Sequence, residues 1–255
     1  MSAASRSPRA LRRLLQRLVY RHWHSFHAIR RLEVAALERE LDLAAGARIL
    51  DLGCGKGPYV GALERRGYTA MGIDPETAQL AVAGRHVTRS GRLAAARGER
   101  LPFRDASFDR VVSVCVLEHT DDDGRVLAEV RRVLKLGGVF ALSVDSVEGF
   151  DEEFRASHAR RFRCNRLYTR DDIRRKLVEA GFEVGHVQAL FSGGVARAVV
   201  RFGERFRFRG PFVLLFPLLY PLLLADRLLS RGAADGLILA VKARPMRPEA
   251  GPSAT

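Results

Sequence analysis

The stretch ILDLGCGKG, Ile49 to Gly57, decides the fold of this chain. An apolar run of strand type leads directly into a GxGxG pattern, and a helical pattern follows. Glycines allow a tight turn and let the backbone approach a ligand closely at the carboxyl edge of a sheet. Asp51 stands just before this turn. The stretch therefore predicts a ligand-binding turn between a buried strand and a helix.

A second carboxylate follows the glycine turn. Asp74 ends another strand-like segment and is followed by Pro75. A carboxylate about 20 residues after the glycines can accept hydrogen bonds from both hydroxyls of a ribose. The spacing alone also suits enzymes that bind nicotinamide or flavin cofactors, so it leaves both classes of nucleotide-binding enzyme open.

Strand-like and helix-like segments alternate outward from this motif. We predict strands at 48–53, 69–74, 92–98, 108–116, 138–145, 182–190 and 237–243. We predict helices near 58–66, 77–88, 122–135 and 170–180, the last opened by a capping box of Thr169 and Asp172. This alternation predicts an α/β fold in which helices cover both faces of a doubly wound parallel sheet.

The glycine motif resembles motif I of the class I S-adenosylmethionine (SAM)-dependent methyltransferases, an acidic residue followed by GxGxG. Dinucleotide-binding folds have GxGxxG, whereas Gly57 is followed here by PYV. Further matches come in order at 97–103, 108–112, 116–119 and 127–138, so the resemblance covers about residues 46–191 and the strand at 237–243. It is greatest to the UbiE-like, methyltransferase type 11 branch. The resemblance implies SAM as the cofactor and a Rossmann-like, seven-stranded sheet with an antiparallel last strand.

The resemblance also implies which residues hold the cofactor. Asp51 and the glycines would form the pocket for the methionine part and the sugar, and Asp74 would hold the ribose hydroxyls. Residues 99 and 101 would flank the adenine, and residues 115–117 would line the pocket floor. The full set is Asp51, Gly53, Cys54, Gly55, Gly57, Asp74, Pro75, Glu99, Leu101, Cys115, Val116 and Leu117. For Cys54 and Cys115, packing in the pocket wall is the expected role.

Three residues are candidates for catalysis. The resemblance places Glu118 and His119 near the sulfonium and the methyl acceptor, and His119 is the first candidate for a general base because histidine titrates in the useful range. A bond to a loop backbone is an equal alternative for His119. His158 is the second candidate, with a surface position as its alternative. We see no metal-ligand spacing in the sequence and predict no metal.

The chain has 255 residues and a formal net charge of +14. We predict a basic, amphipathic helical arm at 1–44, a SAM-binding core at 45–191, a hydrophobic and basic insertion at 192–236, the last core strand at 237–244 and a disordered tail at 245–255. The arm and the segment 195–231 each carry a net charge of +5. Most of the positive charge therefore lies outside the predicted core, which favours an anionic partner for the appendages.

The insertion contains fifteen uncharged residues, Pro211 to Ala225, with arginines on both sides. A membrane-spanning helix needs about 20 apolar residues, and Pro217 and Pro221 should interrupt it. We expect this segment to enter one leaflet of an anionic membrane. Packing against the arm, a lid over the site and a dimer interface are the alternatives.

These features predict a methyltransferase of a hydrophobic or lipid-linked acceptor. We expect it in the cytoplasm, peripheral on the inner face of the membrane, because the three cysteines form no disulfide framework and no signal peptide is evident. A soluble O- or C-methyltransferase of a small molecule is the alternative. An RNA methyltransferase is less favoured, since no RNA-binding module or run of stacking aromatics is seen. A cofactor-binding protein without catalysis is the fourth hypothesis.

Overall fold

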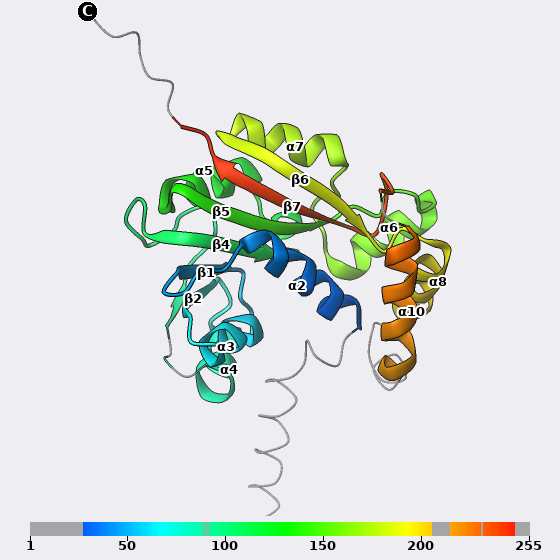
Figure 1. Ribbon diagram of the computed structural model, residues 1–255, viewed down its shortest axis with the longest axis horizontal. Coiled ribbons are helices and arrows are strands. Elements are labelled where there is room, and N and C mark those ends of the chain that lie inside the picture. Colours follow the sequence, from blue (N-terminus) through cyan, green and yellow to red (C-terminus); the bar gives the residue numbers. More distant parts are fainter. Residues whose placement is uncertain (1–27, 89, 91, 206–214, 231, 248–255) are drawn as a thin grey trace, which may run out of the picture.

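The computed structural model of this protein describes residues 28–88, 90, 92–205, 215–230 and 232–247. Parts of three predictions lie outside the described residues: most of the arm, the middle of the insertion and most of the tail. Within the described chain, one sheet is flanked by helices on both faces (Figure 1).

Seven strands of the described chain form the sheet in the order β3-β2-β1-β4-β5-β7-β6. Their bounds are β1 (Arg48–Leu52), β2 (Thr69–Asp74), β3 (Leu93–Ala95), β4 (Phe108–Val114), β5 (Leu134–Asp145), β6 (Phe182–Leu190) and β7 (Ile238–Pro245). The first five strands pair in parallel, and β7 runs antiparallel to both of its neighbours, β5 and β6. The predicted doubly wound sheet with an antiparallel last strand is confirmed.

Alternating side chains in the central strands separate the core into two layers. In β1, Ile49 packs into one hydrophobic cluster and Leu50 into the other. In β4, Val112 and Val111 divide in the same way. Successive strand residues point to opposite faces of a sheet, and here both faces are apolar because both are covered by helices.

The helices are α2 (Ala28–Leu41), α3 (Pro58–Arg65), α4 (Thr77–His86), α5 (Asp123–Val133), α6 (Glu152–Phe162), α7 (Arg170–Glu179), α8 (Gly194–Arg205) and α10 (Phe216–Leu229), with a 3₁₀ turn, η1, at Leu117–His119. The four helices predicted in the core correspond to α3, α4, α5 and α7. The capping box of Thr169 and Asp172 opens α7 as predicted. Helix α6 was not predicted, because only Phe154 and His158 of its residues are buried and its apolar pattern is weak.

Helix α2 is the described part of the predicted arm. It packs against β4, β5 and β7, and its own residues Leu37 and Leu41 are fully buried. Arg110 of β4 donates hydrogen bonds to the carbonyl oxygens of Leu41 and Asp42, where the helix ends. This segment therefore contributes to the hydrophobic core.

Helices α8 and α10 form a pair beside the end of the sheet where β6 and β7 meet (Figure 1). Both prolines lie within α10, which continues through Pro221 although both prolines were expected to interrupt a membrane-spanning helix. Pro217 lies in the first turn, where its missing N–H group is not needed, and only Pro221 removes an internal hydrogen bond. Among the described residues, no helix has the length and apolar character needed to cross a membrane.

Candidate functional site

A cavity of about 520 Å³ opens at the carboxyl ends of the parallel strands. Ligands of doubly wound sheets bind at this edge, and small-molecule sites usually measure about 300–1,000 Å³. The glycine turn, the end of β2 and the residues that follow β3 and β4 meet here. The lining residues are Leu52, Gly53, Ile73, Asp74, Pro75, Glu76, Gln79, Ala96, Arg97, Gly98, Glu99, Cys115, Val116, His119, Thr120, Asp121, Phe162 and Arg163.

The glycine turn after β1 brings the backbone against this cavity. Gly53 has a φ of +72°, a left-handed conformation that side chains disfavour. A Cβ atom on Gly53 would lie 2.5 Å from Cγ2 of Val116, across the cavity floor. The N–H of Cys54 donates to the carbonyl oxygen of Ile73 at 2.8 Å, which joins the turn to β2. Glycine is therefore required at position 53 by both the backbone conformation and the lack of space.

Asp74 is held in place by two backbone N–H groups. Its Oδ2 accepts a hydrogen bond from Gly55 and its Oδ1 accepts one from Glu76, each at 2.9 Å. Each carboxylate oxygen can accept a second bond, so Asp74 keeps acceptor capacity toward the cavity that it lines. Two vicinal hydroxyls of a ribose fit such a carboxylate.

Asp51 lies on β1, the strand next to the one that ends in Asp74. It is almost fully buried, and burial, with a further contribution from the charge of Asp74, raises its pKa to about 8. A buried carboxyl group with a raised pKa beside a ligand cavity is typical of a functional site. A cationic ligand nearby would favour its ionised form.

The opposite end of the cavity is formed by the loop after β3. The backbone N–H of Asp121 donates to Oε1 of Glu99 at 3.2 Å, and Arg97 forms ion pairs with both of these acids. Burial acts to raise the pKa of Glu99, but hydrogen bonds from backbone N–H groups and from Arg97 lower it overall. Glu99 is thus held as an ionised acceptor at the cavity edge.

The structure brings seven of the predicted site residues together around the cavity: Gly53, Asp74, Pro75, Glu99, Cys115, Val116 and His119. The other eight do not line it: Asp51, Cys54, Gly55, Gly57, Leu101, Leu117, Glu118 and His158. Leu101 and Leu117 are buried in the core cluster that contains α5, because each side chain points away from the cavity into that layer. Cys54 packs against Gly72, where an added Cβ would lie 2.7 Å from its sulfur.

Several residues that line the cavity were not predicted from the sequence. Glu76 and Gln79 lie at the start of α4, directly after Asp74, and Thr120 and Asp121 follow η1. A signal existed for Glu76, because residues immediately after the carboxyl end of a parallel strand lie at the ligand edge. Phe162 reaches the cavity only through the C-terminal end of α6, so no local motif identifies it.

His119 lines the cavity with an exposed side chain. Its Nδ1 lies 3.3 Å from the carbonyl oxygen of Arg163, so it also contacts a loop backbone. The contact with a loop backbone is therefore present, and the role of His119 as a general base stays a prediction.

A buried polar cluster lies beneath the cavity floor at Cys115. Oε1 of Glu33, from α2, accepts hydrogen bonds from the Cys115 thiol at 3.0 Å and from the Ser143 hydroxyl at 2.6 Å. Arg30 pairs with the other oxygen of Glu33 at 2.7 Å. Burial and the surrounding carboxylates raise the pKa of the Cys115 thiol well above its usual range. The thiol is therefore neutral, which supports packing as its role.

Glu118 and His158 belong to the same buried region. Oε1 of Glu118 accepts a hydrogen bond from the backbone N–H of Asp145 at 3.2 Å. Burial, followed by the charge of Asp145, raises the pKa of Glu118 well above its usual range. His158 is buried rather than at the surface, and its ring lies between the carboxylates of Asp145 and Glu204. Burial acts to lower the pKa of His158, but these two carboxylates raise it to about 9.

Comparisons with known proteins agree with this geometry. A family model described as a methyltransferase domain matches residues 50–142. A malonyl-[acyl-carrier protein] O-methyltransferase of Geobacter sulfurreducens is 32% identical over 189 residues, which cover 67% of this chain and 70% of that protein. A ubiquinone biosynthesis O-methyltransferase of Pseudomonas fluorescens is 38% identical over 119 residues, and the match spans 44% of this chain and half of that relative's length.

A solved structure shows the same fold with its cofactor. The phosphoethanolamine N-methyltransferase 2 of Haemonchus contortus in complex with SAM has a TM-score of 0.60, with 21% sequence identity, and the match covers 85% of this chain and 53% of that one. At this identity the likeness is one of fold. Together with the relatives that align over most of the core, it gives the family: this chain belongs to the class I SAM-dependent methyltransferases.

Proposed function

We propose that this methyltransferase works at a membrane surface on a hydrophobic or lipid-linked acceptor. The observation that carries the proposal is the apolar outer face of α10. Leu218, Leu222 and Leu229 are 58%, 42% and 89% exposed. Their spacing of four and seven residues places them on one side of the helix. Apolar side chains grouped on a surface in this way mark an interaction site.

Contacts on the inner side of α10 fix the position of this helix. Leu219 and Leu223 are buried on the opposite side of the helix, and Oδ1 of Asp226 accepts a hydrogen bond from the N–H of Val195 at the start of α8. Arg31 of α2 lies 5.0 Å from the ring centroid of Tyr220. The exposed leucines are therefore carried by a helix with a defined orientation.

Basic residues are frequent in α8 and in the sequence around α10. Arg201 and Arg205 are exposed on α8, and the sequence adds Arg207, Arg209 and Arg231 on either side of α10. An apolar helix face with basic neighbours suits the boundary between acyl chains and anionic headgroups. The net positive charge of this part of the sequence favours an anionic membrane over a dimer interface, because two copies of a basic segment repel each other.

The names of two relatives support a hydrophobic or carrier-linked acceptor. One is named for malonyl-[acyl-carrier protein] and the other for ubiquinone biosynthesis. Helix α8 also connects the proposed membrane face to the site, since Glu204 on α8 contacts His158 on α6, and α6 ends at Phe162 in the cavity wall. An acceptor from the bilayer would thus enter beside the elements that carry both features.

For the cofactor, we propose the contacts that the resemblance implies where the cavity fits them. Asp74 binds the ribose hydroxyls, Gly53 and Val116 leave room for the sugar and the methionine part, and Glu99 lies toward the adenine. Bound SAM supplies a methyl group already activated on its sulfonium, so the protein mainly positions the acceptor and excludes water. His119 is the proposed general base, because it lines the cavity whereas His158 and Glu118 do not.

Vesicle binding tests the membrane proposal. The full chain should sediment with vesicles that contain phosphatidylglycerol and remain in the supernatant with phosphatidylcholine alone. Leu218→Glu combined with Leu222→Glu should lower the bound fraction about tenfold or more, because two charges would enter the apolar boundary. Leu136→Glu with Val178→Glu is the matched control, since both residues are exposed apolar side chains outside α10.

Two results would count against the membrane proposal. One is equal sedimentation of the α10 double variant and the control variant. The other is a concentration-dependent dimer that the α10 variant abolishes while vesicle binding is absent, which would make the leucine face an interface between copies.

A further inference from the structure

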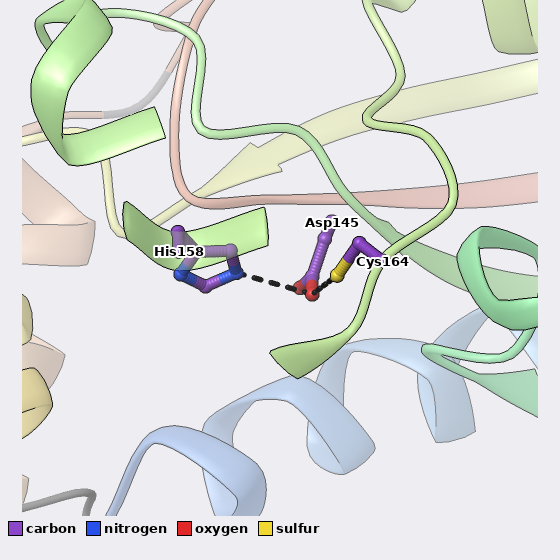
Figure 2. Close-up of side chains that lie close together, drawn as sticks. All are labelled: Asp145, His158 and Cys164. Carbon is purple, nitrogen blue, oxygen red and sulfur yellow. Dashed lines mark hydrogen bonds and ion pairs between the residues drawn. The ribbon is translucent and has the colours of Figure 1, made fainter. Parts of the chain in front are cut away.

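Three side chains of the types that bind transition metals meet behind the cavity wall. Nε2 of His158 lies 3.2 Å from Oδ2 of Asp145, and Sγ of Cys164 lies 3.6 Å from the same oxygen (Figure 2). One ligand atom from each residue lies within 4.8 Å of the others. In a tetrahedral site with bonds of about 2.0–2.3 Å, neighbouring ligand atoms are roughly 3.3–3.6 Å apart. The two measured separations are close to that spacing.

The local fold explains how these residues converge. Asp145 is the last residue of β5, and His158 lies in the second half of α6. Arg163 ends α6 in the left-handed conformation, with a φ of +57°, and the N–H of Cys164 then donates to the carbonyl oxygen of Ala159 at 3.0 Å. This turn directs Cys164 back toward Asp145. Figure 2 shows His158 and Cys164 approaching the Asp145 carboxylate from different elements.

A carboxylate supports His158 from the other side of its ring. Nδ1 of His158 lies 2.5 Å from Oε1 of Glu204, and both side chains are almost fully buried. Histidines that bind metals commonly donate their second ring N–H to a carboxylate, which fixes the ring and increases its basicity. Glu204 has this position, because it contacts Nδ1 while Nε2 faces Asp145.

Glu118 lies on the other side of Asp145, in a neighbouring group that shares this carboxylate. Its side chain is fully buried, and its Oε2 has no hydrogen-bond partner among the described residues. Its carboxylate lies within 4.8 Å of ligand atoms of Asp145 and Cys115. A buried carboxylate oxygen without a partner is costly. A cation beside Asp145 would give it one.

We propose that Asp145, His158 and Cys164 bind a divalent transition-metal ion, best matched by zinc. Nitrogen and thiolate donors select zinc over magnesium or calcium, which prefer oxygen ligands alone. The proposal departs from the expectation drawn from the sequence, where no motif was seen. The ligands are separated by 13 residues and then 6 residues of chain, and only the fold brings Asp145 to the others.

The ion would stabilise one wall of the cavity. Phe162 and Arg163 lie between the ligands His158 and Cys164 in the chain and line the cavity, and the Arg163 carbonyl contacts His119. Binding releases the thiol proton of Cys164 and the proton on Nε2 of His158 to solvent. The metal is thus a positioning element for the wall that contacts His119, and it takes no part in the methyl transfer itself.

Cobalt(II) is a spectroscopic probe for such a site. The reduced, full-length chain, freed of metal with a chelator, should bind one cobalt ion and show a thiolate-to-cobalt band in the near ultraviolet. Cys164→Ser should remove the band, and His158→Ala should weaken zinc binding at least 100-fold in a calorimetric titration. Glu204→Gln should weaken it about 10–100-fold, as expected for a supporting carboxylate. Cys54→Ser is the control that keeps the band.

Several outcomes would contradict the proposed metal site. Absence of the band in the wild-type chain, or its persistence in Cys164→Ser, overturns the proposal. Loss of the band in Cys115→Ser, with Cys164→Ser unaffected, would place the ion at Cys115 and also overturn it. Circular dichroism confirms that each variant is folded, and zinc should raise the Tm of the wild type but not that of Cys164→Ser. None of these measurements depends on the identity of the methyl acceptor.

Discussion

The backbone N–H of Gly55 donates a hydrogen bond to Oδ2 of Asp74 at 2.9 Å. This bond joins the glycine turn after β1 to the end of β2, so the two sequence features that identify the family are one structural unit. The second oxygen of Asp74 is held by Glu76. The carboxylate is thus oriented by the protein's own backbone, and the site is organised before the cofactor binds.

Asp74→Asn should weaken SAM binding about 10–100-fold in a calorimetric titration. The amide loses the charge that strengthens hydrogen bonds to the ribose, and its NH₂ group, if turned toward Gly55, would face another donor. A charge-assisted hydrogen bond contributes about 1.5–3 kcal/mol, and 1.4 kcal/mol is a tenfold change in affinity. Asp105→Asn is the control, because Asp105 is exposed and does not line the cavity. Unchanged affinity in Asp74→Asn would refute the proposed ribose contact.

Gly53→Ala should abolish detectable SAM binding and lower stability by more than Gly46→Ala. Both glycines have positive φ angles, +72° and +78°, so alanine is strained at each by about 1–2 kcal/mol. Only the Cβ at position 53 collides with Val116, whereas nothing lies within 4 Å at position 46. The difference between the two variants therefore isolates the collision. Adding Val116→Ala should recover part of the stability of Gly53→Ala; no recovery would show that the collision is not the cause.

Asp123 should give the protein an acid-sensitive component of stability. Burial acts to raise its pKa, but the Tyr168 hydroxyl at 2.7 Å and the ion pairs with Lys176 and Arg166 lower it overall. Because the pKa is lower in the folded than in the unfolded state, this stabilisation is present above about pH 4 and is lost as pH falls through the folded-state pKa.

Urea unfolding at several pH values measures this component. Asp123→Asn should lower the free energy of unfolding by roughly 2 kcal/mol at pH 7, since it leaves two cations without their partner. The variant should also lose less stability than the wild type on acidification. Parallel pH profiles for the two proteins would rule out Asp123 as the titrating group.

Leu37→Ala should show that α2 is part of the folding unit. Leu37 is fully buried where α2 packs on the sheet, and a Leu→Ala change in a core costs about 2–5 kcal/mol. Leu136→Ala, at a residue 62% exposed, should change stability by less than about 0.5 kcal/mol. Equal unfolding midpoints for both variants would mean that α2 is not cooperative with the sheet.

Most of the sheet could be predicted from the sequence because its strands are apolar runs separated by clear turn and cap signals. All seven predicted strands are present, and β1 pairs with β2 so that Asp51 lies opposite Gly72. Helix α6 was missed since a polar helix with two buried residues has little periodic signal. Helix α10 was not predicted, because Pro217 was expected to interrupt a helix. The first turn of a helix tolerates proline, and Pro217 lies in the first turn of α10.

Only the part of the candidate site that belongs to local sequence motifs could be predicted from the sequence. The glycine turn, Asp74 and the residues after β4 follow strand ends, so their meeting at one sheet edge follows from parallel pairing. The meeting of Asp145, His158 and Glu204 does not follow from strand pairing, because Glu204 lies 46 residues after His158 in the sequence. These residues come together through the packing of α6 and α8, and no spacing rule connects them.

The fraction into which a transferred methyl group partitions tests most directly whether the acceptor is hydrophobic or lipid-linked. The purified enzyme is incubated with radiolabelled SAM and a membrane-containing cell extract, and the products are divided into organic-soluble, aqueous and nucleic-acid fractions. If the acceptor is hydrophobic and enters from a membrane, the label should appear in the organic-soluble fraction. Leu218→Glu combined with Leu222→Glu should reduce this label severalfold, and Leu136→Glu combined with Val178→Glu should leave it unchanged. Label confined to small aqueous products or to RNA, in equal amounts for both variants, would contradict this prediction.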